Sequence, residues 1–180
     1  GKVEMTKEDL KEWKEELSRG YLPLGPAVER LENRWAELSG MKYAVGVNSG
    51  TDGLIISMRT LGIGPGDEVI TVPNTFIATV GAIVAVGAKP ILVDVGDDYL
   101  MDVSQAAKVI TDKTRAVIPV DLTGRPVVHH WREFKFGSNV GPLVIRDSCQ
   151  RIGAQYNGAS SARMSDIAVY SLHPLKNIHA

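Results

Sequence analysis

The first forty residues carry apolar positions at helical spacing, separated by charged positions. One amphipathic helix is predicted to begin at Thr6 and to end near Gly20, since threonine caps helix starts and glycine follows helix ends. A second helix is predicted to have Pro26 in its first turn and to end before Gly40. Its inward-facing side chains are predicted to be Leu31, Trp35 and Leu38. Residues 1–40 are therefore expected to form a helical segment that packs on the rest of the chain.

From residue 41 onward, short β-branched runs alternate with stretches of helical spacing. Strands are predicted at 43–47, 68–72, 91–95, 116–120, 143–147 and 167–170. Helices are predicted at 50–61 and 75–86, and a crossover helix is expected in 127–139, where the pattern is poor. Near-continuous apolar runs such as 117–120 indicate strands buried on both faces. The predicted fold of residues 41–180 is a three-layer αβα sandwich with a mostly parallel sheet.

Composition narrows the classes of function. The net charge is -1, so there is no basic excess to attract nucleic acid or anionic lipid. The longest apolar stretch, 78–88, is too short to span a bilayer, and the first residues lead into a charged segment and not an apolar one. Cys149 is the only cysteine, which excludes an internal disulfide and fits a reducing compartment. We therefore expect a cytoplasmic protein with neither nucleic acid nor membrane as partner.

Polar residues follow three of the predicted strands, and ligands bind at the carboxyl ends of strands in open α/β sheets. Residues 49–52 begin a helix, where unpaired N–H groups favour a phosphate, although a helix capped by Ser49 or Asp52 is the simpler interpretation of these residues alone. Asp147 ends the fifth run and either meets a cationic partner or caps the next turn. Lys176 ends a proline-containing turn, where a solvated surface lysine is the ordinary alternative. Together, a phosphate cradle, a carboxylate for a pyridinium nitrogen and an amine for an aldehyde match the parts of one cofactor.

Other site chemistries are not favoured. Residues 48–52 lack the second glycine of a dinucleotide fingerprint and the lysine of a Walker loop. His129 and His130 are adjacent, so their side chains diverge, and no metal site is expected. Cys149 is interpreted as a small core residue and not as a nucleophile.

Five segments, in this order, resemble the motifs of the DegT/DnrJ/EryC1/StrS family. These are fold-type I pyridoxal-phosphate enzymes, most of them sugar aminotransferases. The segments are 49–54, 64–69, 73–76, 147–150 and 171–177. The resemblance implies that residues 41–180 are the large, pyridoxal-phosphate-binding domain of such an enzyme.

The resemblance implies roles for residues that would hold the cofactor phosphate. Gly50, Thr51 and Asp52 would bind it through backbone N–H groups and the Thr51 hydroxyl. Ser171 would add a second hydroxyl. These residues stand at the start of one predicted helix and at the end of the last predicted strand.

It also implies roles around the pyridine ring. Phe76 would stack on the ring, and Asp147 would pair with its protonated nitrogen. Gln150 would hydrogen-bond the edge that carries the ring hydroxyl. Lys176 would be the Schiff-base lysine and afterwards the base and acid that move the substrate proton. Lys176 and Asp147 are thus the expected catalytic residues.

By resemblance, the activity is transfer of an amino group from an amino acid, with glutamate expected, to a nucleotide-linked keto-sugar. The family implies a homodimer with its sites at the interface. One alternative is a non-catalytic fragment or regulatory relative. Another is a sugar dehydratase on the same scaffold, which Lys176 disfavours because that branch has histidine at this position.

Two features depart from the family pattern. Gly53 stands where alanine is common, although glycine within a helix costs about 0.5–1 kcal/mol relative to alanine. After Lys176 only residues 177–180 follow, whereas the family continues with more sheet and a small C-terminal domain. We therefore expect a chain truncated at its C-terminus, lacking that domain and catalytically inefficient by itself.

Overall fold

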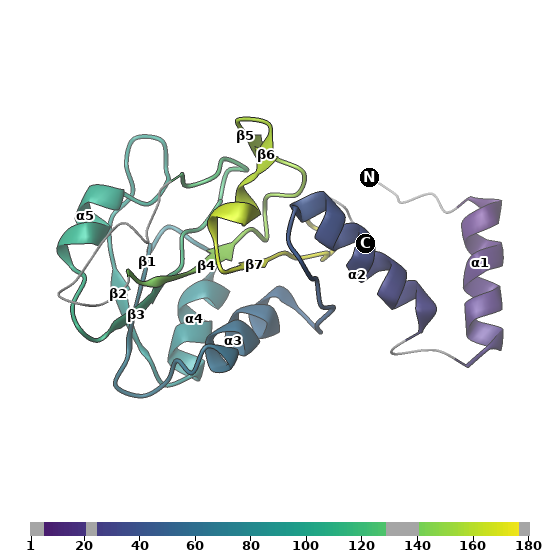
Figure 1. The fold of residues 1–180 in the computed structure, drawn as a ribbon, viewed down its shortest axis with the longest axis horizontal. Coiled ribbons are helices and arrows are strands. Elements are labelled where there is room, and N and C mark those ends of the chain that lie inside the picture. Colours follow the sequence, from purple (N-terminus) through teal and green to yellow (C-terminus); the bar gives the residue numbers. More distant parts are fainter. Residues whose placement is uncertain (1–5, 21–24, 129–140, 177–180) are drawn as a thin grey trace.

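A five-stranded parallel sheet forms the centre of the computed structural model, which describes residues 6–20, 25–128 and 141–176 (Figure 1). The strand order is β2-β1-β3-β4-β7, and each neighbouring pair is parallel. The strands are β1 (Glu68–Thr71), β2 (Lys89–Leu92), β3 (Thr114–Val117), β4 (Leu143–Asp147) and β7 (Ile167–Val169). The sequence-based expectation of a mostly parallel sheet is confirmed.

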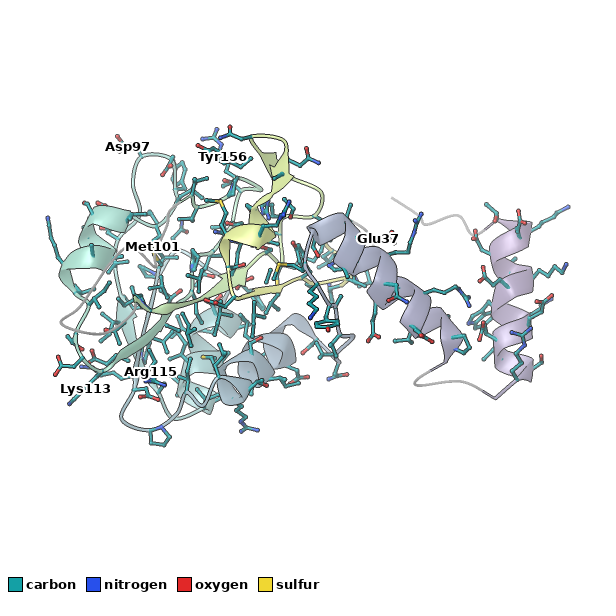
Figure 2. The ribbon with its side chains drawn as sticks, in the orientation of Figure 1. Glu37, Asp97, Met101, Lys113, Arg115 and Tyr156 are labelled. Atoms are coloured by element: carbon teal, nitrogen blue, oxygen red, sulfur yellow. The ribbon has the colours of Figure 1, made fainter. Side chains whose placement is uncertain are left out.

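Helices lie on both faces of this sheet, which completes the predicted three layers (Figure 1). One apolar core joins the sheet to α3 (Gly50–Thr60) and α4 (Ile77–Ala85), and it includes Leu54, Ile83 and Ile145. A second core, on the other face, joins the sheet to α5 (Val103–Lys108). Charged side chains such as those of Glu37, Asp97 and Lys113 lie at the outside of the molecule (Figure 2).

The smaller elements lie at the margins. A two-stranded antiparallel ribbon, β5 (Gln155–Tyr156) with β6 (Ala159–Ser160), is followed by the short 3-10 helix η2 (Ser161–Met164). Neither this ribbon nor α5 was predicted from the sequence. For α5 the missed signal is Asp102, whose side chain caps the helix by accepting hydrogen bonds from the backbone N–H groups of Ser104 and Gln105.

The two N-terminal helices begin and end as the sequence predicts. Helix α1 (Lys7–Ser18) is capped by Thr6, and α2 (Pro26–Ser39) ends at Gly40, whose φ of 66° is left-handed. In Figure 1, α1 lies beyond α2, away from the sheet. An ion pair of 2.6 Å between Arg30 and Glu12 links the two helices.

The predicted inward face of α2 is correct only at Trp35. The side chains of Leu31 and Leu38 are exposed. Trp35 is partly buried, and its ring meets that of Tyr170 edge-on with 5.3 Å between centroids. The helix therefore does not pack along the whole predicted apolar stripe, because spacing alone does not reveal how much of a helix face has a partner.

The accuracy of the strand predictions differs from strand to strand. The predicted strand 143–147 has the bounds of β4, and 68–72 and 167–170 each extend one residue too far. Strands β2 and β3 begin two residues earlier than the predicted 91–95 and 116–120. For β2 the reason is Pro90, which an edge strand tolerates because one side of its backbone has no partner.

The strand predicted at 43–47 is wrong. The structure assigns no strand there, and the side chains of Tyr43 and Val45 are exposed. Among the described residues, no strand lies beside this segment to complete a ladder. Instead, the backbone N–H of Gly46 donates to the Glu32 carboxylate of α2 at 2.6 Å. The crossover helix expected in 127–139 falls almost entirely outside the described residues.

Close packing explains why glycine and not alanine stands at position 53. A Cβ built on this residue would lie 2.8 Å from Cγ1 of Val169 in β7, closer than real carbon atoms approach. Val169 is buried and β-branched, so its methyl group has little room to move. The glycine therefore lets α3 lie directly against the last described strand.

We expect Gly53→Ala to destabilise the fold by about 1–3 kcal/mol, because overpacking outweighs the better helix propensity of alanine. Gly81→Ala is the matched control: Gly81 lies within α4, and a Cβ there would meet no atom of the described residues within 4 Å. The control should stabilise by about 0.5–1 kcal/mol. Urea unfolding of both variants measures the difference, and a Gly53→Ala protein as stable as Gly81→Ala would contradict the packing argument.

Candidate functional site

The carboxyl ends of β4 and β7 meet the starts of α3 and α4. From α4, the Thr79 hydroxyl donates to Oδ2 of Asp147 at the end of β4, at 2.8 Å. From α3, a Cβ on Gly50 would lie 2.8 Å from Sγ of Cys149 and 3.5 Å from Cβ of Ser171. These five residues come from distant parts of the sequence, and the fold brings them together at one edge of the sheet.

Asp147 is buried, with 6% of its surface exposed. Its Oδ2 accepts from Thr79, and its Oδ1 accepts from the backbone N–H of Cys149 at 3.2 Å. No lysine or arginine in the described residues forms an ion pair with it. A buried carboxylate ordinarily has a cationic partner, because removing a charge from water is costly. Asp147 is therefore suited to a cation supplied by a ligand.

The start of α3 combines a cap with open N–H groups. The Ser49 hydroxyl accepts from the backbone N–H of Asp52 at 3.1 Å, so the capped-helix interpretation is correct. The Asp52 carboxylate in turn accepts from Ser49 and from the Asn48 amide. The N–H groups of Gly50 and Thr51 have no acceptor in the described part of the chain. An anion would therefore meet these two groups, while the N–H of Asp52 is already used.

Lys176 and Phe76 lie close to each other across the site. Nζ of Lys176 is 5.6 Å from the centroid of the Phe76 ring, within the range of a cation–π contact. Phe76 is the residue before α4, and 61% of its surface is exposed. An exposed aromatic ring beside a partly buried amine leaves a flat surface available to a planar ligand.

The other two predicted residues flank this group. Ser171 is partly buried, and its hydroxyl accepts from the backbone N–H of His173 at 3.3 Å. Gln150 is partly buried in the turn after Asp147, and its side chain forms no hydrogen bond with the described residues. Gln150 is thus free to contact a ligand.

Cys149 lies inside the site, but its thiol is not expected to act as a nucleophile. Burial raises the pKa of the Cys149 thiol, and the negative charge of Asp147 raises this pKa further. A raised pKa keeps the sulfur protonated at neutral pH, and the thiolate is the nucleophilic form. The interpretation of Cys149 as a small packing residue therefore agrees with its surroundings.

Thr79 was missed by the sequence reasoning. It is fully buried and shares a hydrogen bond of 2.7 Å with the Thr75 hydroxyl while donating to Asp147. The available signal was two threonines four residues apart at a predicted helix start, which can face the same side.

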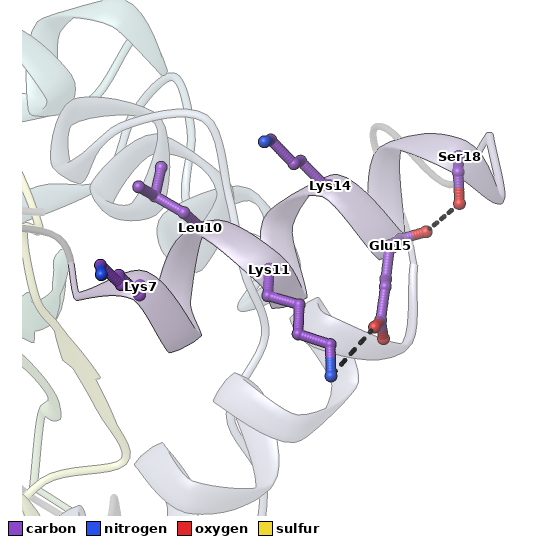
Figure 3. Close-up of a pocket in the computed structure, with 6 residues that line it drawn as sticks. All are labelled: Lys7, Leu10, Lys11, Lys14, Glu15 and Ser18. Atoms are coloured by element: carbon purple, nitrogen blue, oxygen red, sulfur yellow. Dashed lines mark hydrogen bonds and ion pairs between the residues drawn. The ribbon is translucent and has the colours of Figure 1, made fainter.

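A depression also runs along α1, apart from this site (Figure 3). Figure 3 shows that its six lining residues all come from one helix, with Lys11 paired to Glu15 at 4.0 Å. Because no second element contributes side chains, this surface lacks the convergence of a binding site.

Neither a metal site nor a membrane span is found in the described ranges. No group of three or more histidine, cysteine, aspartate or glutamate residues there could hold a metal ion. No helix there is long and apolar enough to cross a bilayer.

The sequence model of the DegT/DnrJ/EryC1/StrS aminotransferase family matches residues 3–180. The chain belongs to this family. It is 44% identical, over 158 residues, to a UDP-N-acetyl-3-dehydro-alpha-D-glucosamine 3-aminotransferase of Acidithiobacillus ferrooxidans, covering 87% of this chain and 42% of that protein. It is 39% identical over 158 residues to a pleiotropic regulatory protein of Geobacillus stearothermophilus, again covering 87% and 42%.

Two solved structures that are similar to this chain have the same fold. The putative sugar aminotransferase Spr1654 of Streptococcus pneumoniae, in a PLP-form, superposes with a TM-score of 0.85 at 30% identity, over 96% of this chain and 48% of that one. DesV of S. venezuelae, solved with a ketimine intermediate, gives a TM-score of 0.79 at 34% identity, over 96% and 47%. The chain therefore spans less than half the length of each of these relatives.

We expect Thr79→Val to destabilise the folded chain by about 1–3 kcal/mol, because the buried Asp147 carboxylate loses a hydroxyl donor. Thr79→Ser keeps the hydroxyl and is the matched control, with a smaller loss. The free energy of unfolding in urea at neutral pH measures both. Equal stability of the valine and serine variants would contradict the importance of this hydrogen bond.

Proposed function

We propose that this chain is the cofactor-binding part of a pyridoxal-phosphate-dependent aminotransferase. The observation that carries the proposal is the buried Asp147 carboxylate, which has no cationic partner in the described residues and shares one site with the Lys176 amine. A pyridinium nitrogen is a cation of the right kind for such a carboxylate.

The donor set fits the remaining parts of the cofactor. The open N–H groups of Gly50 and Thr51, the Thr51 hydroxyl and the Ser171 hydroxyl suit a phosphate at the start of a helix. A Cβ on Gly50 would collide with Cys149, so only glycine fits at this end of α3, and without a side chain its backbone N–H is accessible to a phosphate. The donors agree with the roles that the family resemblance implies, except that the Asp52 N–H is already bonded.

Around the ring, Phe76 would cover one face, Gln150 would hydrogen-bond the hydroxyl edge, and Asp147 would accept a hydrogen bond from the ring nitrogen. Lys176 would attach the cofactor through Nζ and, as a free amine, take up and return the substrate proton. When bound, pyridoxal phosphate supplies an electron sink for negative charge at the reacting carbon.

For the substrates, we propose an amino-acid donor, with glutamate first, and a nucleotide-linked keto-sugar as acceptor. The names of the relatives support the sugar class, since they include UDP-sugar and dTDP-sugar aminotransferases. The homodimer with sites at its interface and the cytoplasmic location stay predictions. Incubating the purified protein with glutamate and candidate keto-sugars, and following cofactor absorbance and product mass, tests the activity.

A regulatory role is the second candidate, and the 39% identity to a pleiotropic regulatory protein favours it. A regulator that binds the cofactor without turnover would hold pyridoxal phosphate yet give no pyridoxamine phosphate with glutamate. An aminotransferase gives both results, so the glutamate half-reaction separates the two.

Lys176→Ala should abolish the covalent cofactor adduct that borohydride fixes, and should lower turnover by about 10²–10⁴-fold through loss of the proton carrier. Lys42→Ala is the matched control, because Lys42 also lies over an aromatic ring, that of exposed Tyr43 at 4.9 Å, but far along the chain from Lys176. Mass spectrometry of the reduced protein measures the adduct. An adduct that survives Lys176→Ala within the site would rule out the assignment.

Asp147→Asn should slow the glutamate half-reaction by about tenfold to a hundredfold, the equivalent of one hydrogen bond to a charged group. Cofactor retention should suffer less, because the amide oxygen still accepts from Thr79. Asp97→Asn, at an exposed position, is the control. Stopped-flow absorbance gives the rate and equilibrium dialysis the retention. An asparagine variant with the unaltered rate would remove Asp147 from the mechanism.

A further inference from the structure

A buried charged cluster lies on the sheet face opposite the candidate site. We call Asp121, Arg146, Ser148 and Arg151 the Asp121 centre; their side chains are at most 1% exposed. Oδ1 of Asp121 accepts from Nη1 of Arg146 at 3.0 Å and from the backbone N–H of Val127 at 3.1 Å. Its Oδ2 accepts from the Ser148 hydroxyl at 3.0 Å and from Nε of Arg151 at 2.7 Å.

Strand geometry separates this centre from Asp147. Successive side chains in a strand point to opposite faces, so Arg146 and Asp147 project to different sides of β4. Asp147 reaches Thr79 of α4, whereas Nη2 of Arg146 donates to the backbone oxygen of Val127 in the other core at 2.9 Å. The Asp121 centre thus contacts the end of β4 on the face opposite the Asp147 side chain.

The composition of the centre is costly for stability alone. Two guanidinium groups face one carboxylate, and Nε of Arg146 is buried without a hydrogen-bond partner in the part of the chain that the structure describes. Burial lowers the pKa of Arg146, against the opposing effect of Asp121. Apolar residues of similar volume often stabilise a core as well as a buried ion pair does, so these charges call for another explanation.

The contacts of the centre bracket Asp147 in the chain. Arg146 and Ser148 are its two neighbours, and both donate to Asp121. The backbone N–H of Asp121 also donates to the backbone oxygen of Asp147 at 3.0 Å. Arg151 connects the centre to the turn after Asp147, since its backbone N–H donates to the backbone oxygen of Ser148 at 2.9 Å.

We propose that the Asp121 centre is a positioning device for Asp147: it holds the peptides on both sides of that residue, and so sets the direction in which the carboxylate meets the cofactor ring. The inference rests on the proposed function and adds residues to its site. Strand β4 ends at Asp147, whose backbone still pairs with Val120 in an isolated bridge, and the side-chain hydrogen bonds to Asp121 add to this backbone pairing.

Ser148→Ala tests this, because it removes one donor to Asp121 and leaves both ion pairs in place. Ser161→Ala is the matched control: Ser161 is also a buried serine, but its hydroxyl has no hydrogen-bond partner among the described residues. The readouts are the dissociation constant for pyridoxal phosphate, the visible circular dichroism of the bound cofactor, which reports its orientation, and urea unfolding of the cofactor-free protein.

Under conditions where all proteins are folded, Ser148→Ala should bind pyridoxal phosphate about threefold to tenfold more weakly, the effect of one hydrogen bond. Its dichroism should also change, while Ser161→Ala keeps the constant and the dichroism of the unaltered protein. A variant that loses stability but keeps both would show a merely structural centre and overturn the proposal.

Asp121→Asn, which keeps the shape of the side chain but removes its charge, should give a larger effect of the same kind. If this variant does not fold, the Ser148→Ala result decides alone. Failure of the unaltered protein to bind pyridoxal phosphate would overturn the proposed function and the positioning role with it, whereas normal binding with no response to Ser148→Ala would overturn the positioning role only.

Discussion

The hydrogen bond from Thr79 to Asp147 joins the first turn of α4 to the end of β4, and the candidate site is arranged around it. The carboxylate is buried where the strand ladder stops, so its charge and direction depend on the few donors around it. Because those donors include no lysine or arginine side chain of the described chain, the site is electrostatically incomplete without a ligand. That incompleteness, more than any single motif, is what makes a pyridinium cofactor a physically reasonable occupant.

Close packing determines where the phosphate-binding groups lie. Gly53 allows α3 to touch Val169 of β7, and Gly50 allows the start of the same helix to touch Cys149. These two contacts bring the open N–H groups of α3 beside Ser171, at the end of the strand that leads to Lys176. Glycine lowers the stability of an isolated helix, but in α3 it allows the helix to lie close to the sheet. The packing of α3 on β7 therefore explains why a residue with poor helix propensity stands there.

The accuracy of the strand predictions follows burial. Residues 143–147 lie between two neighbouring strands and two helical layers. The segment is therefore an apolar run followed by Arg146 and Asp147, and the first and last residues of the strand can be recognised in the sequence. Strands β2 and β3 each begin with two residues that are not buried, which explains why both were predicted to begin too late. The exposed segment 43–47 has the composition of a strand but no partner in the described sheet, and strand propensity is largely a preference for a paired, half-buried surface.

The amino-acid sequence by itself determined the alternation of the five sheet strands with α3 and α4, the caps at Thr6 and Ser49, and the motifs that carry the family likeness, because these depend on neighbours a few residues apart. Only the tertiary structure decided that Thr79 would bind a carboxylate 68 residues away and that Asp121 would gather Arg146, Ser148 and Arg151 from the end of another strand. Such pairings depend on the order of strands in the sheet and on which face each side chain takes, and no local spacing encodes either.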